Sequence, residues 1–286
     1  MPKPYSIRIF LPGGDPDGIR TIEKSNWSGS GLVFPRVLMD QARQRKELER
    51  TGVYILLGPA EDNGLPKVYV GEGDSIRSRL DNHVKNKEFW DTCVAFTSTD
   101  ENMNKAHIRY LESRLCALAA AGKRCILENS TTPQIPPISE ADAAYAEGYL
   151  IELLLCLPTL GVSVFEMPSS SENEQTRVDF CIASKGIEAF GIETPKGFIV
   201  RAGSTAVIDE VRSMEGSLGS KLRVALQANA VLVSNGSALV FTQDYVFNSP
   251  STAASVVLGR SANGREEWKT KRGQTLKAIQ GGEAIL

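Results

Sequence analysis

Apolar residues follow two regular spacings in the first half of the chain. Two short runs, 52–57 and 67–71, are rich in β-branched, aromatic and aliphatic residues and flank a turn-like segment, which predicts a β-hairpin with a long loop. Ile76, Leu80 and Val84 then recur at every fourth position, and this spacing predicts a helix with one buried face. The glycine-rich stretch between the two patterns is expected to form the turn into that helix.

The same region continues with one more strand and a long helix. An apolar run over 91–98 predicts the strand. Apolar residues at helical spacing over 104–121 predict the helix, with Gly122 as its C-cap. The expected order is therefore β-β-α-β-α, an α+β arrangement in which helices flank a short central antiparallel sheet.

Less regular patterns lie on both sides of this region. Residues 1–50 hold a strand-like alternation at 6–11 and a charged stretch over 39–50 that predicts a helix. Beyond residue 137 we expect a helix over 138–157, a polar linker over 169–175, strands over 177–183 and 197–203, a helix over 220–229, a hairpin over 231–241 and a helix that begins at Ser249-Pro250. The chain then divides into an N-terminal strand-containing extension (1–50), a small α+β domain (51–137), a helical connector and linker (138–176) and a C-terminal α+β domain (177–286).

Composition and charge restrict the classes of protein to which the chain can belong. Of its 286 residues, 42% are hydrophobic and 23% charged, values that favour folded domains over disorder. Lys and Arg number 32 and Asp and Glu number 34, so the formal net charge is 32 − 34 = −2. Any binding of nucleic acid must then come from a local patch of cations, because the bulk charge does not attract it.

Cysteine usage and apolar runs favour a cytoplasmic protein with no membrane segment. The five cysteines contain no C-x-x-C pair, which argues against a zinc site or a disulfide framework, and scattered thiols suit a reducing compartment. The N-terminus lacks the apolar core of a secretory signal. The longest apolar run, 149–157, is too short to span a bilayer and is interrupted by Glu152.

Six polar side chains fall at positions from which they can meet in the small α+β domain. Two lie on the paired strands, two share a helix face at a spacing of four, one lies at the margin of the long helix's apolar face and one follows that helix: Tyr54, Tyr69, Arg79, His83, Glu112 and Asn129. Taken singly, each would be an ordinary strand, helix-surface or turn residue. Together they suit phosphodiester hydrolysis. An Arg can clamp phosphate oxygens, a carboxylate can hold a hydrated divalent metal, and a Tyr or His can take a proton from water.

The order of these residues resembles the GIY-YIG nuclease superfamily over roughly residues 50–137. The two family signatures correspond to Gly52-Val53-Tyr54 and Tyr69-Val70-Gly71, with Val in place of Ile in each. The resemblance implies an endonuclease acting on DNA, with Mg²⁺ or Mn²⁺ held by Glu112. It further implies that Arg79 clamps the phosphate, His83 assists proton transfer and Asn129 orients the site, while either Tyr54 or Tyr69 activates or positions the water.

The C-terminal part offers a separate candidate surface. The stretch from 197 to about 276 resembles a domain of unknown function that accompanies the nuclease module in a bacterial-type subgroup. Within it, Lys269, Lys271 and Arg272 could hold a nucleic-acid backbone while Trp268 stacks on a base, or else the tail is solvated and Trp268 docks on the core. The alternative hypothesis for the whole chain is therefore a catalytically inactive module that binds nucleic acid or protein through this domain.

Overall fold

The computed structural model of the protein describes residues 4–60, 64–100, 102–131, 133–167, 178–184 and 186–282. The chain forms two compact units, one made of Met1–Glu61 with Pro66–Phe165 and the other of Asp62–Leu65 with Glu166–Leu286. We call them the N-terminal unit and the C-terminal unit. Each combines helices with mainly antiparallel sheet, so the expected α+β class is confirmed. The linker expected over 169–175 lies outside the described residues.

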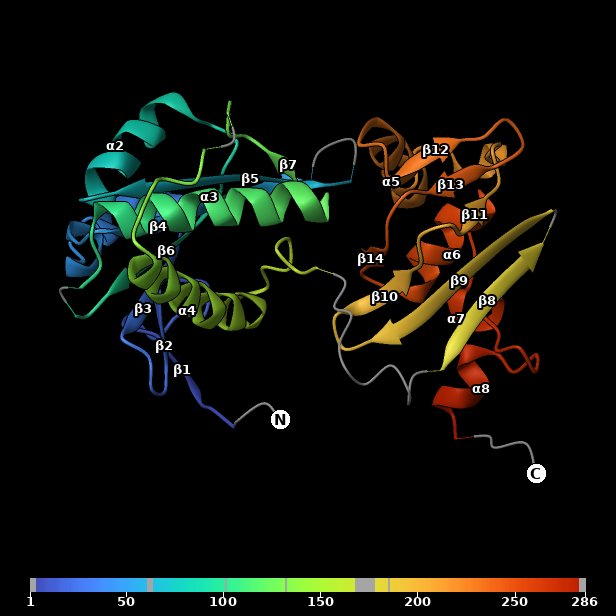
Figure 1. The fold of residues 1–286 in the computed structure, drawn as a ribbon, viewed down its shortest axis with the longest axis horizontal. Helices are drawn as coiled ribbons and strands as arrows, with labels where there is room; N and C mark the ends of the chain where they lie inside the picture. The colour runs from blue at the N-terminus through green and yellow to red at the C-terminus, as the bar shows by residue number, and fades with distance from the viewer. Residues whose placement is uncertain are drawn as a thin grey trace. The chain divides into compact units, whose positions relative to one another are not determined.

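A seven-stranded sheet forms the centre of the N-terminal unit (Figure 1). Its strands, in spatial order, are β1 (Ile7–Phe10), β2 (Arg20–Lys24), β3 (Gly29–Pro35), β6 (Thr92–Ser98), β4 (Gly52–Ala60), β5 (Pro66–Gly73) and β7 (Ile126–Leu127). Neighbouring strands are antiparallel except β5 and β7, which run parallel. The expected hairpin is β4–β5. Because β3 pairs with β6, the strands of the first 50 residues continue the same sheet.

Three long helices cover the two faces of this sheet: α2 (Ile76–Asn86), α3 (Lys105–Gly122) and α4 (Glu140–Cys156). Side chains alternate along a strand, so Tyr54 and Val53 point to opposite faces. Tyr54 packs with Ile76 and Leu80 of α2, whereas Val53 belongs to the core formed with α3 and α4. Strand β5 therefore lies between α2 on one face and α3 on the other (Figure 1).

The start of α3 is fixed by a capping box. The Asn104 side chain accepts hydrogen bonds from the backbone N–H groups of Ala106 and His107, and Nδ1 of His107 accepts one from the backbone N–H of Asn104. At the other end, Lys123 rather than Gly122 adopts the left-handed conformation, with φ of 49°. The helix is therefore confirmed, and it ends one residue later than its sequence predicts.

The charged segment before β4 is not the continuous helix that its sequence predicts. Only Met39–Ala42 (α1) is α-helical, and irregular and 3₁₀ turns lie on either side of it. Arg43 pairs with Asp81 at 2.7 Å, and Arg77 pairs with Glu49 at 2.9 Å. These two pairs hold the segment against α2, although Arg43 also pairs with Asp40 within the segment.

Helix α4, with the 3₁₀ turn η3 (Leu157–Leu160) that follows it, is long and apolar enough to cross a membrane by length and composition alone. Core helices of folded domains pass the same test. Tyr149, Leu150 and Leu153 are buried in the core that α4 shares with α3 and the sheet, and the Tyr149 hydroxyl donates to the Thr97 carbonyl at 2.8 Å. These contacts pack one face of α4 into the core of the N-terminal unit.

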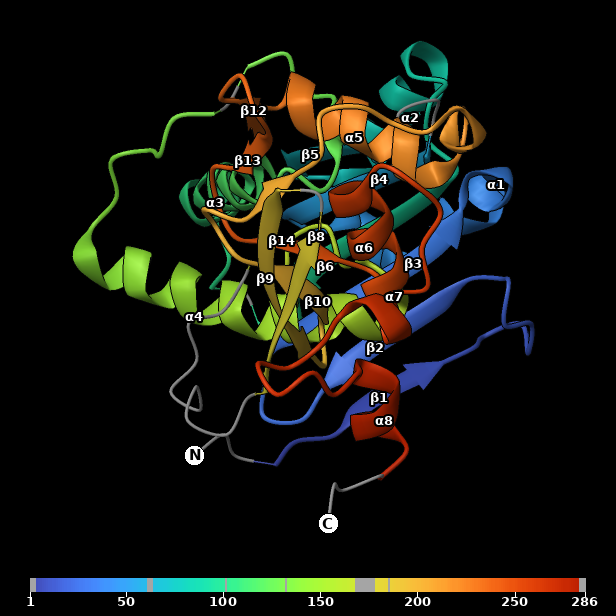
Figure 2. The same cartoon turned by 90° about the vertical axis from the view of Figure 1, so that its right-hand side faces the viewer.

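The C-terminal unit contains two smaller sheets. The four-stranded sheet runs β14 (Tyr245–Phe247), β10 (Gly197–Val200), β9 (Ile187–Thr194) and β8 (Asp179–Ser184), and the three-stranded sheet runs β11 (Thr205–Ala206), β13 (Leu239–Phe241) and β12 (Leu232–Ser234). The helices are α5 (Leu218–Ala228), α6 (Pro250–Leu258), α7 (Gly264–Glu267) and α8 (Leu276–Gln280). Helix α6 packs against β10 and β14 (Figure 2), and it begins at the predicted Ser249 cap with Pro250 in its first position.

Candidate active site

The β4–β5 hairpin places both candidate tyrosines on the α2 face of the sheet. Tyr54 lies opposite Gly71 and Leu56 lies opposite Tyr69, so the two tyrosines are diagonal neighbours with ring centroids 6.3 Å apart. A Cβ atom on Gly71 would lie 2.3 Å from the Tyr54 hydroxyl oxygen. The glycine of the second signature is therefore needed for space, because the Tyr54 ring lies across it.

Tyr54 and His83 form a buried hydrogen-bonded pair. The Tyr54 hydroxyl and Nε2 of His83 are 2.7 Å apart, and both side chains are buried. Burial, followed by the nearby cations Lys87 and Arg79, lowers the pKa of His83 to about 4. The imidazole is thus neutral at neutral pH, and the ring tautomer decides which of the two groups donates this hydrogen bond. Burial also raises the pKa of Tyr54 well above its usual range, so this phenol keeps its proton.

Tyr69 lies beside the Tyr54–His83 pair and is half-buried. Its ring meets the His83 ring edge-on at 4.9 Å, and Nζ of Lys87 lies 4.4 Å from the ring centroid. Burial raises the pKa of Tyr69, whereas the charge of Arg79 acts to lower it. Of the two phenols, Tyr69 is the one that solvent and a ligand can reach.

Arg79 lies among the two phenols and Glu72. Burial lowers the Arg79 pKa, but the interactions with Tyr54, Tyr69 and Glu72 outweigh that effect and the net pKa is raised. A Cβ atom on Gly73 would lie 2.8 Å from Cγ of Arg79. The second glycine of this turn therefore leaves the space that the Arg79 side chain occupies. The guanidinium is a fixed positive charge that retains donors for phosphate oxygens.

Glu112 reaches the cluster from α3, on the other side of β5. Burial, and then the negative charge of Glu72, raise the pKa of Glu112 to about 7, while Arg79, Arg109 and Lys105 act to lower it. Glu112 thus shares an electrostatic environment with Arg79, and Arg79 with Tyr54 and Tyr69. Four predicted side chains from four separate elements, β4, β5, α2 and α3, are brought to one region along β5.

Glu72 is a member of this region that the sequence did not single out. It follows the second signature directly and points to the α3 face, where its carboxylate is 2.6 Å from Nζ of Lys105 and its side chain is only 13% exposed. Lys105 also lies 3.4 Å from Asp74. The available signal was alternation: Val68, Val70 and Glu72 share one face of β5, so an acid at the third position must lie beside α3.

Asn129 holds the sheet instead of offering a free amide to the site. Its Oδ1 accepts from the backbone N–H of Val70 at 3.0 Å, and its Nδ2 donates to the Val70 carbonyl at 2.8 Å. This pair of bonds extends the β5–β7 pairing next to Tyr69. Asn129 therefore fixes the backbone of β5 that carries Tyr69, and its orienting role in the site stays a prediction.

The carboxylates of the region are the donors that a divalent cation could use. Within the described ranges, no group of three or more His, Cys, Asp and Glu side chains is placed to hold a metal ion. Mg²⁺ does not require such a group, because it keeps several waters and is commonly bound by one or two carboxylates. Glu112 and Glu72 lie close enough for the charge of one to raise the pKa of the other. Such a pair fits a hydrated divalent cation, which would relieve that repulsion.

The predicted C-terminal surface needs one correction. Trp268 is fully buried, its Nε1 donates to the Pro250 carbonyl at 3.0 Å, and its ring packs on Phe198 with centroids 4.6 Å apart. It cannot serve as a stacking platform for a base, because both faces belong to the core. The three cations predicted with it, Lys269, Lys271 and Arg272, are exposed.

Comparison with known proteins gives one match. Residues 180–280 match the family described as a domain of unknown function, DUF4357. The matched segment overlaps the stretch from 197 to about 276, in which the sequence led us to expect such a domain, and it lies within the C-terminal unit. No curated protein and no solved structure matches the chain.

Proposed function

We propose that this protein is a divalent-metal-dependent endonuclease of the GIY-YIG type that hydrolyses phosphodiester bonds in DNA. The observation that carries the proposal is the meeting of Tyr54, Tyr69, Arg79 and Glu112 around β5, in the order β4-β5-α2-β6-α3. Burial shifts the pKa values of the titratable members from their ordinary ranges, as is frequent at catalytic sites.

The geometry suggests a distinct role for each side chain. Arg79 binds non-bridging oxygens of the scissile phosphate and stabilises the charge that develops there. Tyr69, the accessible phenol, positions the attacking water, while Tyr54 is hydrogen-bonded to the neutral ring of His83. Asn129 fixes the strand that carries Tyr69. Glu112, with Glu72 beside it, would hold Mg²⁺ or Mn²⁺, and such an ion would supply Lewis-acid polarisation of the phosphate.

A plasmid-nicking assay with Mg²⁺ or Mn²⁺ tests this proposal. Wild type should convert supercoiled DNA to the open-circular form, and Glu112→Ala should lose activity by at least about a hundredfold, as when a group that stabilises transition-state charge is removed. Glu88→Gln removes an exposed carboxylate of the same unit and should cut like wild type. Equal rates for wild type and Glu112→Ala in highly purified samples would refute the mechanism.

The alternative is a catalytically inactive module that binds through the C-terminal unit. The exposed cations Lys269, Lys271 and Arg272 favour it. Folded wild type that cuts with neither metal, yet binds DNA in a salt-sensitive manner, would support this alternative.

A further inference from the structure

A short hairpin in the C-terminal unit presents two adjacent cations on a fixed backbone. Lys269 pairs through its backbone with Cys181 of β8 on one side and with Thr275 on the other, so the segment 269–275 extends the four-stranded sheet. Gly273 has a φ of +82°, and its N–H bonds to the Thr270 carbonyl at 2.8 Å, which closes the turn. The buried Trp268 anchors the start of the hairpin in the core.

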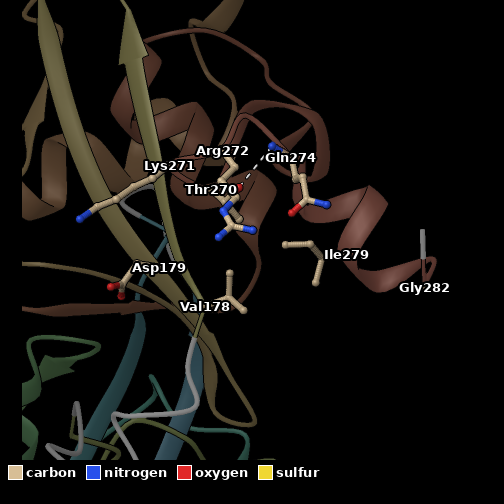
Figure 3. Close-up of a pocket in the computed structure, with 8 residues that line it drawn as sticks. All are labelled: Val178, Asp179, Thr270, Lys271, Arg272, Gln274, Ile279 and Gly282. Carbon is tan, nitrogen blue, oxygen red and sulfur yellow. Dashed lines mark hydrogen bonds between the residues drawn. The ribbon is translucent and has the colours of Figure 1, made fainter. Parts of the chain in front are cut away.

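The tip of this hairpin borders a pocket of about 650 Å³ (Figure 3). Its lining includes Val178, Thr270, Lys271, Arg272, Gln274 and Ile279. Figure 3 shows the Arg272 guanidinium on the side of Val178 and Ile279, while Lys271 extends in another direction from the same turn. The volume lies within the usual range for small-ligand sites, and the walls combine apolar surface with a cation and an amide.

The pocket cations differ from Arg260 and Lys277, two basic residues of the same segment that form ion pairs. Arg260 is bound by Glu267 at 2.6 Å, and Lys277 by Glu266 at 2.9 Å. Among the described residues of this unit, neither Lys271 nor Arg272 forms an ion pair. Their charges are therefore available to an external anion, although the pocket also contains one acidic residue, Asp179.

We propose that this pocket binds a nucleotide unit of single-stranded DNA. A phosphate meets the Arg272 guanidinium, and the next phosphate along the strand meets Lys271, which extends beyond the pocket. The base lies against the apolar wall of Val178 and Ile279, where the Gln274 amide can bond to its edge. The choice of DNA rests on the proposed nuclease function, and the pocket would keep a displaced strand close to the enzyme independently of how the two units are arranged.

Binding of a fluorescent oligothymidylate to the full-length protein in EDTA tests this inference without cleavage. Lys271→Ala/Arg272→Ala should weaken binding about tenfold and reduce the slope of log K against log salt by roughly 1.4, or about 0.7 for each lost phosphate contact. Lys196→Ala/Arg212→Ala removes the same charge from exposed sites of the unit outside the pocket and should change affinity less than about twofold. Ile279→Ala should weaken binding with the salt slope unchanged, because it removes only base contact.

Three outcomes would overturn the inference. The first is equal weakening by the two double variants, which would reduce the effect to bulk charge. The second is an affinity equal to that of wild type for both Lys271→Ala/Arg272→Ala and Ile279→Ala. The third is displacement of the oligomer by free thymidine monophosphate at an equal nucleotide concentration, which would indicate a site for free nucleotides. If wild type nicks plasmid but the pocket substitutions leave oligomer binding unchanged, this inference alone is refuted. If the pocket substitutions weaken binding but wild type does not nick plasmid, the nuclease proposal alone is refuted.

Discussion

Tyr54, His83, Tyr69 and Glu112 around β5 are buried or half-buried among the elements that carry them, whereas the cations of the 269–275 hairpin are exposed on a backbone scaffold. In the first region, burial and neighbouring charges move the pKa values of His83 and Glu112 from their ordinary ranges. In the second, the supporting residue Trp268 is buried and the charges it supports are not. Charges act more strongly where water is excluded, so the first arrangement suits bond chemistry and the second suits reversible binding of an anion.

This contrast indicates where each region is vulnerable. The β5 region depends on close contacts between its own polar side chains, so a single added atom disturbs it. The hairpin depends on an anchor that lies outside its charged tip.

Trp268→Ala should have the largest effect on stability. Removal of a fully buried tryptophan leaves a cavity next to Phe198, and we expect a loss of about 3–5 kcal/mol in the free energy of unfolding. Urea unfolding followed by circular dichroism would measure it, with the two units fitted separately if their transitions differ. Trp268→Phe keeps an aromatic ring but loses the bond to Pro250 and part of the buried volume, so its cost should be smaller than that of alanine. A cost below about 1 kcal/mol for the alanine variant would show that the hairpin has another anchor.

Gly71→Ala should come second. The added Cβ would lie 2.3 Å from the Tyr54 hydroxyl oxygen, and relieving that overlap should cost about 1–3 kcal/mol and break the bond between Tyr54 and His83. The matched control is Gly148→Ala in α4, whose Cβ meets nothing within 4 Å and which should gain about 0.5–1 kcal/mol from helix propensity. Equal stability of the two variants in urea unfolding would show that the packing of Tyr54 against the strand can relax.

Glu112→Gln should have the smallest effect, and its sign should depend on pH. The folded-state pKa of about 7 lies above the ordinary 4.5, so between these values the folded protein holds a proton that the unfolded chain releases. The stability of wild type should therefore fall as pH rises from 4.5 to 7. Above pH 7 the glutamine variant should be more stable by about 1 kcal/mol, allowing for partial solvent screening.

Thermal melting of wild type and Glu112→Gln across this pH range measures the difference. Mg²⁺ should raise the melting temperature of wild type above pH 7 more than that of the variant, because the ion relieves the carboxylate repulsion. Parallel pH profiles for the two proteins would contradict the assignment of a displaced pKa to Glu112.

The sequence predicted the elements that local periodicity encodes. The hairpin, the three following elements and α4 all follow from runs or spacings of apolar residues. The way β1 to β3 join the sheet was not predictable in this manner, because β3 starts with Gly29-Ser30-Gly31 and its partner β6 (Thr92–Ser98) is distant in sequence. Strand β9 also escaped prediction, since two of its eight residues are charged and one is glycine.

The site was predicted as a set of residues but not as a set of contacts. The joint pattern of Tyr54, Tyr69, Arg79 and Glu112 placed them in one region. It did not indicate that His83 binds Tyr54, because that contact depends on the rotation of α2 over the sheet. The sequence left Trp268 between stacking on a base and docking on the core, because its charged neighbours suggested exposure, and packing on Phe198, 70 positions earlier, selects the core.

The Asn129 side chain has a consequence for solubility. Strand β5 has only the two-residue β7 beyond it, so most of its outer edge would be open to pairing with a strand of another molecule. The Asn129 amide bonds both the N–H and the carbonyl of Val70, as the backbone of one more paired residue would. One side chain thus doubles as protection against edge-to-edge aggregation.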